Sequence, residues 1–319
     1  MNNIVIFRFC LLCLLLNSIS TLADDRLEQP LSDTCKEFRS VFTKPDNKKS
    51  QIENTRFKTG LLWKIESPTG KTNYLFGTMH SQDYTVSEIP PQVRLALVKS
   101  KTLLMETIPD EAANQAFLNM MYFKDKQRLD TLLEPELLQA LTIKIQDYGV
   151  AQEHANFVKP WAAFSLIGRP KPVRAPTLES NLFHTAQQGM LQIKSLETME
   201  EILSALDGLA MEDQIIILKD TICNHEQIIK DTKILVNLYL NRDLQGMVEF
   251  NNQPHYDEAV FERFMQRILY DRNTRMLETI EKEFNDGNVF VAVGASHLAD
   301  KKGLLSELEK RGYTLTIVY

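Results

Sequence analysis

The sequence predicts an α/β fold, and two short segments carry that prediction. Residues 73–80 read NYLFGTMH and residues 288–297 read NVFVAVGASH. Each segment is rich in the apolar, aromatic and β-branched residues typical of a buried strand, and each ends in Gly-x-x-His. A polar turn, a helical pattern and another apolar strand follow in both cases. We therefore expect a sheet built around two βαβ units, each with a Gly-x-x-His at a strand end.

The segments around the two motifs extend this pattern. We expect a helix and then a strand after each motif, at residues 93–98 and 102–107 in the first unit and at 304–311 and 313–319 in the second. A strand at 61–66 and the turn residues at 67–71 predict a hairpin with the first motif strand.

Between the two units the chain reads as helix. Leucine, isoleucine and methionine recur there at spacings of three and four, as amphipathic helices require. Helices are predicted at 114–123, 135–146, 160–167, 211–224, 226–241 and 259–284, the last being the longest, and a short strand fits near 193–197. We expect residues 59–319 to form one α/β domain, in which a helical insertion at about 110–286 covers the sheet edge like a lid.

The two motif histidines and one glutamate form the candidate site. Ligands of parallel sheets bind outside the carboxyl ends of the strands, where His80, His297 and Glu106 would meet. Two imidazoles and a carboxylate suit a divalent cation. Alternatively, each histidine is only a polar residue that ends a strand. Glu106 interrupts the predicted strand at 103–108, so it either faces solvent or meets the positive charge of His80.

Both ends of the chain carry a resemblance to a known family. The chain resembles the TraB/PrgY/GumN family, which includes the Tiki proteases. The resemblance lies near the N-terminal end of the predicted domain in residues 61–65 (LLWKI) and 74–80 (YLFGTMH), and at its C-terminal end in residues 289–297 (VFVAVGASH), Gly303 and 311–313 (RGY). The resemblance implies a fold related to the erythromycin-esterase and ChaN-like proteins and, in some members, a metal-dependent protease.

The resemblance also draws attention to three positions outside the motifs. The family keeps a glutamate in the segment of Glu106, a Leu-Glu-Thr segment like that of Glu197, and an Arg-Asn pair like Arg272-Asn273. An arginine at such a site could hold a substrate carboxylate or stabilise an oxyanion. The alternative for Arg272 is a surface charge on a helix, paired with Asp271 or Glu278.

These observations predict a metal-dependent hydrolase that acts on a peptide or protein. Glu106 would be either a third ligand beside the two histidines or the general base, and His80 could act as a base without metal. The alternative is a non-catalytic protein that binds a peptide signal, a metal or haem in the same cleft. A serine hydrolase is not indicated, since Gly294-Ala-Ser-His-Leu298 lacks the last glycine of a nucleophile elbow.

The N-terminus predicts export. Residues 1–23 contain Arg8, the apolar run 9–16 and small residues before Asp24, as in a cleaved signal peptide, although an uncleaved anchor is the alternative. Residues 24–58 would then form an N-terminal arm of a periplasmic or secreted protein, with no later stretch long enough to span a membrane.

Charge and cysteine content bear on the possible partners of the protein and on its disulfide bonding. The formal net charge is −6 and no basic tract is present, which argues against nucleic acid as a partner. After cleavage Cys35 and Cys223 remain, and in an oxidising compartment they form either a disulfide or two separate thiols. The isolated histidines His154, His184 and His255 are expected to be ordinary surface or core residues, and the segment His225-Glu226 lacks the second histidine that a zincin helix requires.

Overall fold

A mixed six-stranded sheet is the centre of the fold. The computed structural model describes residues 33–40, 56–108 and 110–319, so the predicted signal peptide (1–23) and most of the predicted arm (24–58) lie outside the described residues. The strands lie in the order β4-β3-β5-β2-β1-β6. Their bounds are β1 Leu62–Glu66, β2 Thr72–Thr78, β3 Thr102–Met105, β4 Gln192–Ser195, β5 Val289–Gly294 and β6 Thr314–Ile317.

The two motif strands, β2 and β5, are neighbours in this sheet. They pair in parallel, with Gly77 opposite Val293 and Thr78 opposite Gly294. Asn73 fixes the start of this pairing, because its side chain accepts from the amide of Val289 at 3.1 Å and donates to the carbonyl of Phe284 at 3.3 Å. Segments more than 200 residues apart in sequence therefore end side by side, as the two motifs predict.

The predicted hairpin and both βαβ units are present, but the units interlock. β1 and β2 form an antiparallel hairpin. β5 lies between β2 and β3, the two strands of the first unit, and pairs in parallel with both. β6 does not pair with β5. It pairs antiparallel with β1 instead, because the hairpin leaves that edge of β1 open.

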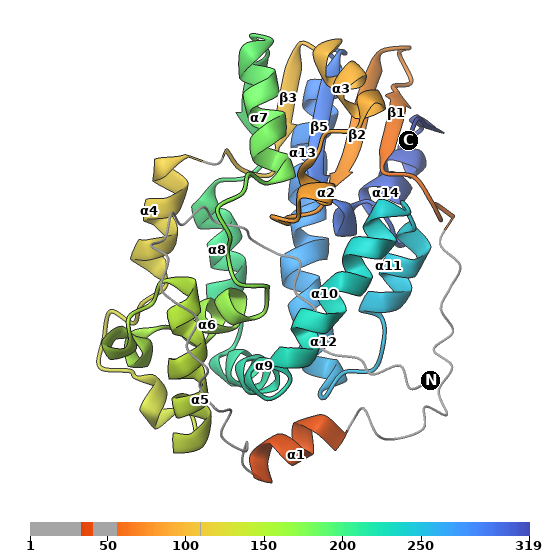
Figure 1. The fold of residues 1–319 in the computed structure, drawn as a ribbon. Coiled ribbons are helices and arrows are strands. Elements are labelled where there is room, and N and C mark those ends of the chain that lie inside the picture. The colour runs from red at the N-terminus through yellow and green to blue at the C-terminus, as the bar shows by residue number, and fades with distance from the viewer. Residues whose placement is uncertain (1–32, 41–55, 109) are drawn as a thin grey trace.

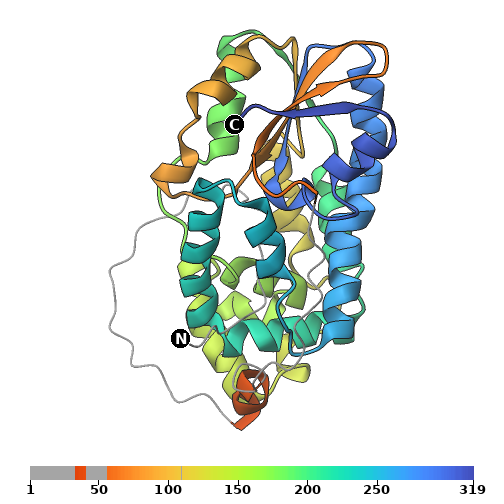
Figure 2. The ribbon, with the colours of Figure 1, turned by 90° about the vertical axis from the view of Figure 1, so that its right-hand side faces the viewer.

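Helices cover both faces of the sheet, which gives three layers (Figures 1 and 2). α3 (Pro91–Val98) and α7 (Leu178–Gln188) lie on one face, and α13 (Asp271–Phe284) and α14 (Leu304–Lys310) lie on the other. The apolar residues between these layers form one buried cluster, which includes Phe76, Leu104 and Phe290.

The helical insertion forms a second apolar cluster beyond the carboxyl ends of β2 and β5 (Figure 1). It contains Trp161 and Phe264, both fully buried. The remaining helical elements of the described chain are α1 Asp33–Ser40, α2 Tyr84–Ser87, α4 Glu111–Met120, η1 Leu129–Thr131, α5 Pro135–Ile145, η2 Gln146–Tyr148, η3 Gln152–Phe157, α6 Pro160–Ile167, α8 Met199–Asp207, α9 Met211–Cys223, α10 His225–Leu240, α11 Leu244–Asn251, α12 Glu258–Met265, η4 Gln266–Tyr270 and η5 Ala295–His297. None of the described helices has the length and apolarity needed to cross a bilayer.

One predicted helix of the insertion is present and contains a π-helical turn. The segment 259–284 consists of α12, the π-helical turn η4 and α13. Apolar periodicity survives such an inserted residue, which is why the sequence pattern reads as one helix. The π turn ends at Tyr270, two residues before Arg272, and π turns frequently occur at functional sites.

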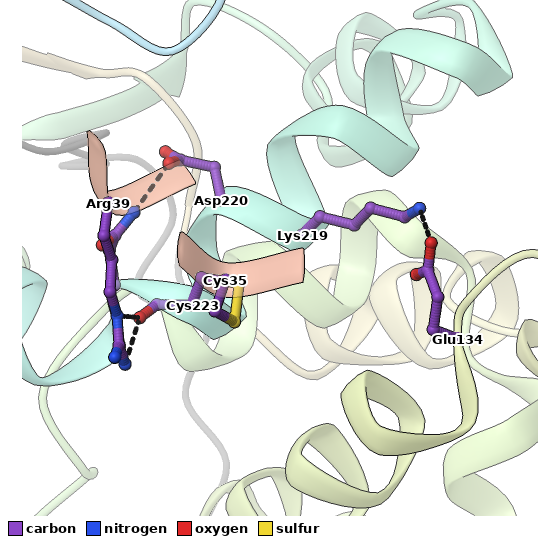
Figure 3. Close-up of a disulfide and its surroundings, with 7 residues drawn as sticks. Cys35, Arg39, Glu134, Lys219, Asp220 and Cys223 are labelled. Carbon is purple, nitrogen blue, oxygen red and sulfur yellow. Dashed lines mark hydrogen bonds and ion pairs between the residues drawn. A yellow bond between two sulfur atoms is a disulfide. The ribbon is translucent and has the colours of Figure 1, made fainter. Parts of the chain in front are cut away.

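Of the two alternatives for Cys35 and Cys223, the disulfide is the one present (Figure 3). Cys35 and Cys223 are joined, with their Cα atoms 5.2 Å apart, inside the 4.4–6.8 Å range expected from disulfide geometry. Arg39 adds to this connection, since its Nε and Nη2 donate to the carbonyl of Cys223 at 3.2 and 3.1 Å. The disulfide therefore fixes α1 to α9 in the helical cluster.

Candidate functional site

The glycines of the two motifs allow the strand ends to approach each other. A Cβ atom on Gly77 would lie 2.6 Å from Cδ1 of Leu298 and 3.1 Å from Cα of Ala295, so a side chain there would displace the η5 turn. A Cβ atom on Gly294 would lie 3.3 Å from Oε1 of Glu106. Each glycine thus leaves room for a part of the site contributed by another segment of the chain.

Glu106 lies directly after β3, and both of its oxygens are bonded. Oε1 accepts from the amide of Gly294 at 2.6 Å, and Oε2 accepts from Nη2 of Arg272 at 2.5 Å. The expectation that Glu106 interrupts a longer strand is wrong, because β3 ends at Met105. Glu106 is buried rather than solvent-facing, and its hydrogen-bonded cation is Arg272 instead of His80.

Arg272 joins two carboxylates inside the protein. It lies on the first turn of α13 and is fully buried. Besides the bond to Glu106, its Nε donates to Oε2 of Glu197 at 2.8 Å. Oε1 of Glu197 accepts from Arg275, one turn later, at 3.0 Å. Arg272 is therefore no surface charge, and it links the end of β3 to the helical insertion.

His297 is buried and held through one ring nitrogen. Its Nδ1 lies 2.6 Å from Oδ1 of Asn273, whose amide group donates to the carbonyl of Lys302 at 2.9 Å. Because Oδ1 can only accept, Nδ1 carries the proton and Nε2 keeps its lone pair. Nε2 faces Nη1 of Arg272 at 3.5 Å and Oε2 of Glu106 at 3.7 Å.

Burial and charge set the protonation states of this pair. Burial, helped by the positive charge of Arg272 and opposed by Glu106, lowers the pKa of His297 to about 4. Burial alone would raise the pKa of Glu106, but His297, Arg272 and His80 together hold it well below its usual range. Since His297 is neutral near pH 7, Arg272 is the lasting source of positive charge that keeps Glu106 ionised.

His80 is held by a different partner. Its Nδ1 lies 3.2 Å from Oε1 of Glu179, which is on the first turn of α7. Both oxygens of Glu179 are shielded from solvent, and the His80 ring and the Thr78 hydroxyl act on this carboxylate. Burial opposes ionisation, but His80, the Thr78 hydroxyl and a backbone hydrogen bond together hold the pKa of Glu179 below its usual value. The charge of His80 also lowers the pKa values of Glu106 and His297, so the three groups are close enough to interact electrostatically.

A comparison with known families agrees with this arrangement. The sequence profile of the TraB/PrgY/gumN family matches residues 61–317, which span both motifs and every residue of the site. The chain belongs to the TraB/PrgY/gumN family. The resemblance seen in the sequence is thereby confirmed, and the α/β fold predicted from the two motif segments is the fold observed. No curated protein matches the chain.

This TraB/PrgY/gumN chain brings most of its sequence-predicted site residues together. Glu106, His297 and Arg272 are in direct contact, and Glu197 is bonded to Arg272. Asp83, three residues after His80, has a different role, because it is the N-cap of α2 and accepts from the amide of Thr85.

Two site residues of the TraB/PrgY/gumN chain have a role that sequence reasoning did not assign. Asn273 lies next to Arg272, and the Arg-Asn pair of the family resemblance was the available signal. Glu179 lies 99 residues beyond His80 in the insertion, on the first turn of a helix capped by Thr177. Its only sequence signal is the ordinary one of a helix start.

The side chains of this TraB/PrgY/gumN site are of the types that bind a divalent cation. In each histidine an oxygen of another residue faces Nδ1, an arrangement common in metal-binding histidines, and Glu106 is an ionised carboxylate. Within residues 33–40, 56–108 and 110–319, no three His, Cys, Asp or Glu side chains gather closely enough to hold an ion as they stand. Both Glu106 oxygens already have partners, so this carboxylate would have to share them with a cation.

Proposed function

We propose that this protein is an exported hydrolase that cleaves peptides at a site formed by His80, Glu106 and His297. The observation that carries the proposal is the orientation of His297. Asn273 holds the proton on Nδ1, so Nε2 keeps its lone pair as an acceptor; it faces Nη1 of Arg272 at 3.5 Å, and Oε2 of Glu106 lies 3.7 Å away. A neutral imidazole and an ionised carboxylate fixed side by side in a buried site are the groups that proton transfer or cation binding requires.

Hydrolysis of a peptide bond needs a proton taken from water and a proton delivered to the leaving nitrogen. In the proposed reaction Oε2 of Glu106 or Nε2 of His297 accepts the water proton, and the same atom then delivers it to the leaving amine. Arg272 and the amide of Gly294 keep the Glu106 carboxylate in one position during this exchange. Positioning of this kind lowers the barrier because no groups have to be ordered as the reaction occurs.

A divalent cation is part of the proposal. His80, His297 and Glu106 would hold it, and when bound it would lower the pKa of a water molecule and polarise the scissile carbonyl. Support for the cation comes from the donor types and the outer partners of the histidines, and support for a peptide substrate comes from the family resemblance.

Export is proposed on separate grounds. The disulfide between Cys35 and Cys223 is of the kind that persists in oxidising compartments. Together with the signal-like residues 1–23 it supports a periplasmic or secreted location. Mass spectrometry of the protein from its own host should give Asp24 as the N-terminus, and retention of Met1 would contradict cleavage.

The test of hydrolysis uses a pooled peptide library and the purified protein. We expect cleavage products by mass spectrometry, loss of cleavage with a chelator, and recovery on adding back Zn²⁺, Mn²⁺ or Co²⁺ singly. Glu106→Gln should abolish turnover. Glu136→Gln, which changes an exposed first-turn glutamate of α5 in the helical insertion, is the matched control and should leave turnover unchanged.

The Glu106→Gln variant also separates the two roles of the carboxylate. If the variant loses its metal as measured by elemental analysis, Glu106 is a ligand; if it keeps metal and loses turnover, Glu106 is the base. If the wild-type protein cleaves nothing with any of the three metals, the hydrolase proposal is wrong. Calorimetric binding of library peptides or metal would then favour a binding protein that uses the same site.

A further inference from the structure

The two motif histidines are held in the same way by different elements. At His297, the oxygen of Asn273 on α13 faces Nδ1 at 2.6 Å. At His80, a carboxylate oxygen of Glu179 on α7 faces Nδ1 at 3.2 Å. In both cases an oxygen from a helix outside the motif approaches the nitrogen nearer the backbone, so the distal nitrogen is the one left for chemistry in each ring.

The contact between Glu179 and His80 determines where the ring proton lies. An ionised carboxylate accepts hydrogen bonds and cannot donate them, so a lone pair on Nδ1 at 3.2 Å would repel it. A proton on Nδ1 removes that repulsion and gives the buried carboxylate a donor, which it needs because both of its oxygens are shielded from solvent. The neutral His80 ring therefore favours the Nδ1–H form.

Three further contacts fix Glu179 at this place. The Thr78 hydroxyl, from the motif strand itself, acts on the same carboxylate. Gln82, two residues after His80, accepts from the amide of Val173 at 2.8 Å and donates to the carbonyl of Ala175 at 3.2 Å, just before α7 begins. These bonds dock the start of α7 on the first motif, so the position of Glu179 relative to His80 is built into the fold.

We infer that Glu179 is the positioning residue of His80, which holds the ring in its Nδ1–H form and thereby directs Nε2 to the reaction. The helical insertion thus contributes to both motif histidines, through Glu179 at one and Asn273 at the other. This inference deepens the proposed hydrolase function and rests on it for the effect on turnover, but the position of the ring proton can be measured without any activity.

The test is nitrogen-15 NMR of histidine-labelled protein, in which long-range couplings distinguish the two neutral ring forms. The chain has six histidines, and the His80 signals are identified by their loss in His80→Gln. We expect wild-type His80 to be Nδ1–H. Glu179→Met keeps the length of the side chain but removes both acceptors, so His80 should move toward the Nε2–H form that free imidazole side chains prefer. Glu179→Gln retains one acceptor oxygen and should keep Nδ1–H.

Turnover supplies a second readout. Loss of a residue that positions a site histidine typically lowers activity by about 10–100-fold. We expect a decrease of this size in the kcat of Glu179→Met, with KM unchanged, and a smaller decrease in Glu179→Gln. Glu136→Gln is the control for loss of a first-turn helix charge and should change neither readout.

The outcomes of these two measurements are separable. A neutral wild-type His80 in the Nε2–H form overturns the inference without any variant, and unchanged His80 signals in a folded Glu179→Met protein overturn it as well. If no peptide is cleaved but the NMR result holds, the proposed function fails and the positioning role stands.

Discussion

Replacement of Arg272 by leucine should be among the most destabilising single changes in this protein. The guanidinium is fully buried and lies between the carboxylates of Glu106 and Glu197, whose side chains are 11% and 1% exposed. Removal of one partner of a buried ion pair leaves the other charge without compensation, at a cost of about 3–5 kcal/mol. We expect a loss near the upper figure for Arg272→Leu, because two carboxylates lose their shared cation.

Arg275 is a matched control on the same helix. It binds the other oxygen of Glu197 at 3.0 Å, but its side chain is 46% exposed. Solvent screening limits such a pair to about 0.2–1 kcal/mol, so Arg275→Leu should have a much smaller effect. Urea unfolding followed by circular dichroism gives both values. Equal losses for the two variants would refute the argument that burial of Arg272 sets its contribution.

The loss in Arg272→Leu should also depend on pH. In the wild-type protein the pKa of Glu106 is held below its unfolded value, so its contribution to stability is present above that value and disappears as pH falls. The variant lacks this contribution, and its uncompensated Glu106 favours the protonated form. The difference between variant and wild type should therefore be largest at pH 7 and shrink toward pH 4. A difference that grows on acidification would contradict this assignment.

Three further changes test other parts of the fold. Cys35→Ser combined with Cys223→Ser removes a crosslink with a sequence separation of 188, whose stabilisation of the fold is about 5 kcal/mol at most by the chain-entropy relation. The double variant should melt at a lower temperature, and the wild-type protein in reductant should melt at the same lowered temperature. Gly77→Ala should cost about 1–3 kcal/mol in urea unfolding, because its Cβ would lie 2.6 Å from Cδ1 of Leu298; an unchanged midpoint would show that η5 can shift freely. Burial raises the pKa of Asp220 to about 7, so wild-type stability should fall as pH rises from about 4 to 7, by up to about 4 kcal/mol, and Asp220→Asn should remove this slope.

The position of the two motif histidines could be predicted from the sequence because the same strand motif occurs twice. Strand composition followed by Gly-x-x-His occurs twice, and parallel strands bring their carboxyl ends to one edge, so the placement of the two motif ends follows from sequence. Glu106 was predicted as a charge at the end of an apolar strand, chiefly with the help of the family resemblance, which includes a glutamate in this segment. Its partner Arg272 emerged only through the family resemblance, since an arginine on an amphipathic helix is ordinarily exposed.

Other parts of the structure leave no local signal. Glu179 contacts His80 only because α7 docks against the first motif, and that docking depends on contacts between residues about 90 positions apart. The pairing of β6 with β1 is likewise a matter of which sheet edge is open, which strand composition does not encode. The π turn η4 preserves apolar spacing on either side and is therefore invisible to periodicity.

The residues around Arg272 are far apart in the sequence, so the site can form only late in folding. Glu106, Glu197, Arg272 and His297 come from four separate segments, and the bond between Glu106 and Arg272 alone closes a loop of 166 residues. Contacts this far apart form late in folding, because the entropy of large loops must be lost before they can contribute. A nascent chain that has not reached β5 contains the first motif, Glu106, Glu197 and Arg272, but it lacks His297 and the strand that lies between β2 and β3. A fragment that ends before the second motif therefore lacks the complete set of residues that we propose as the site.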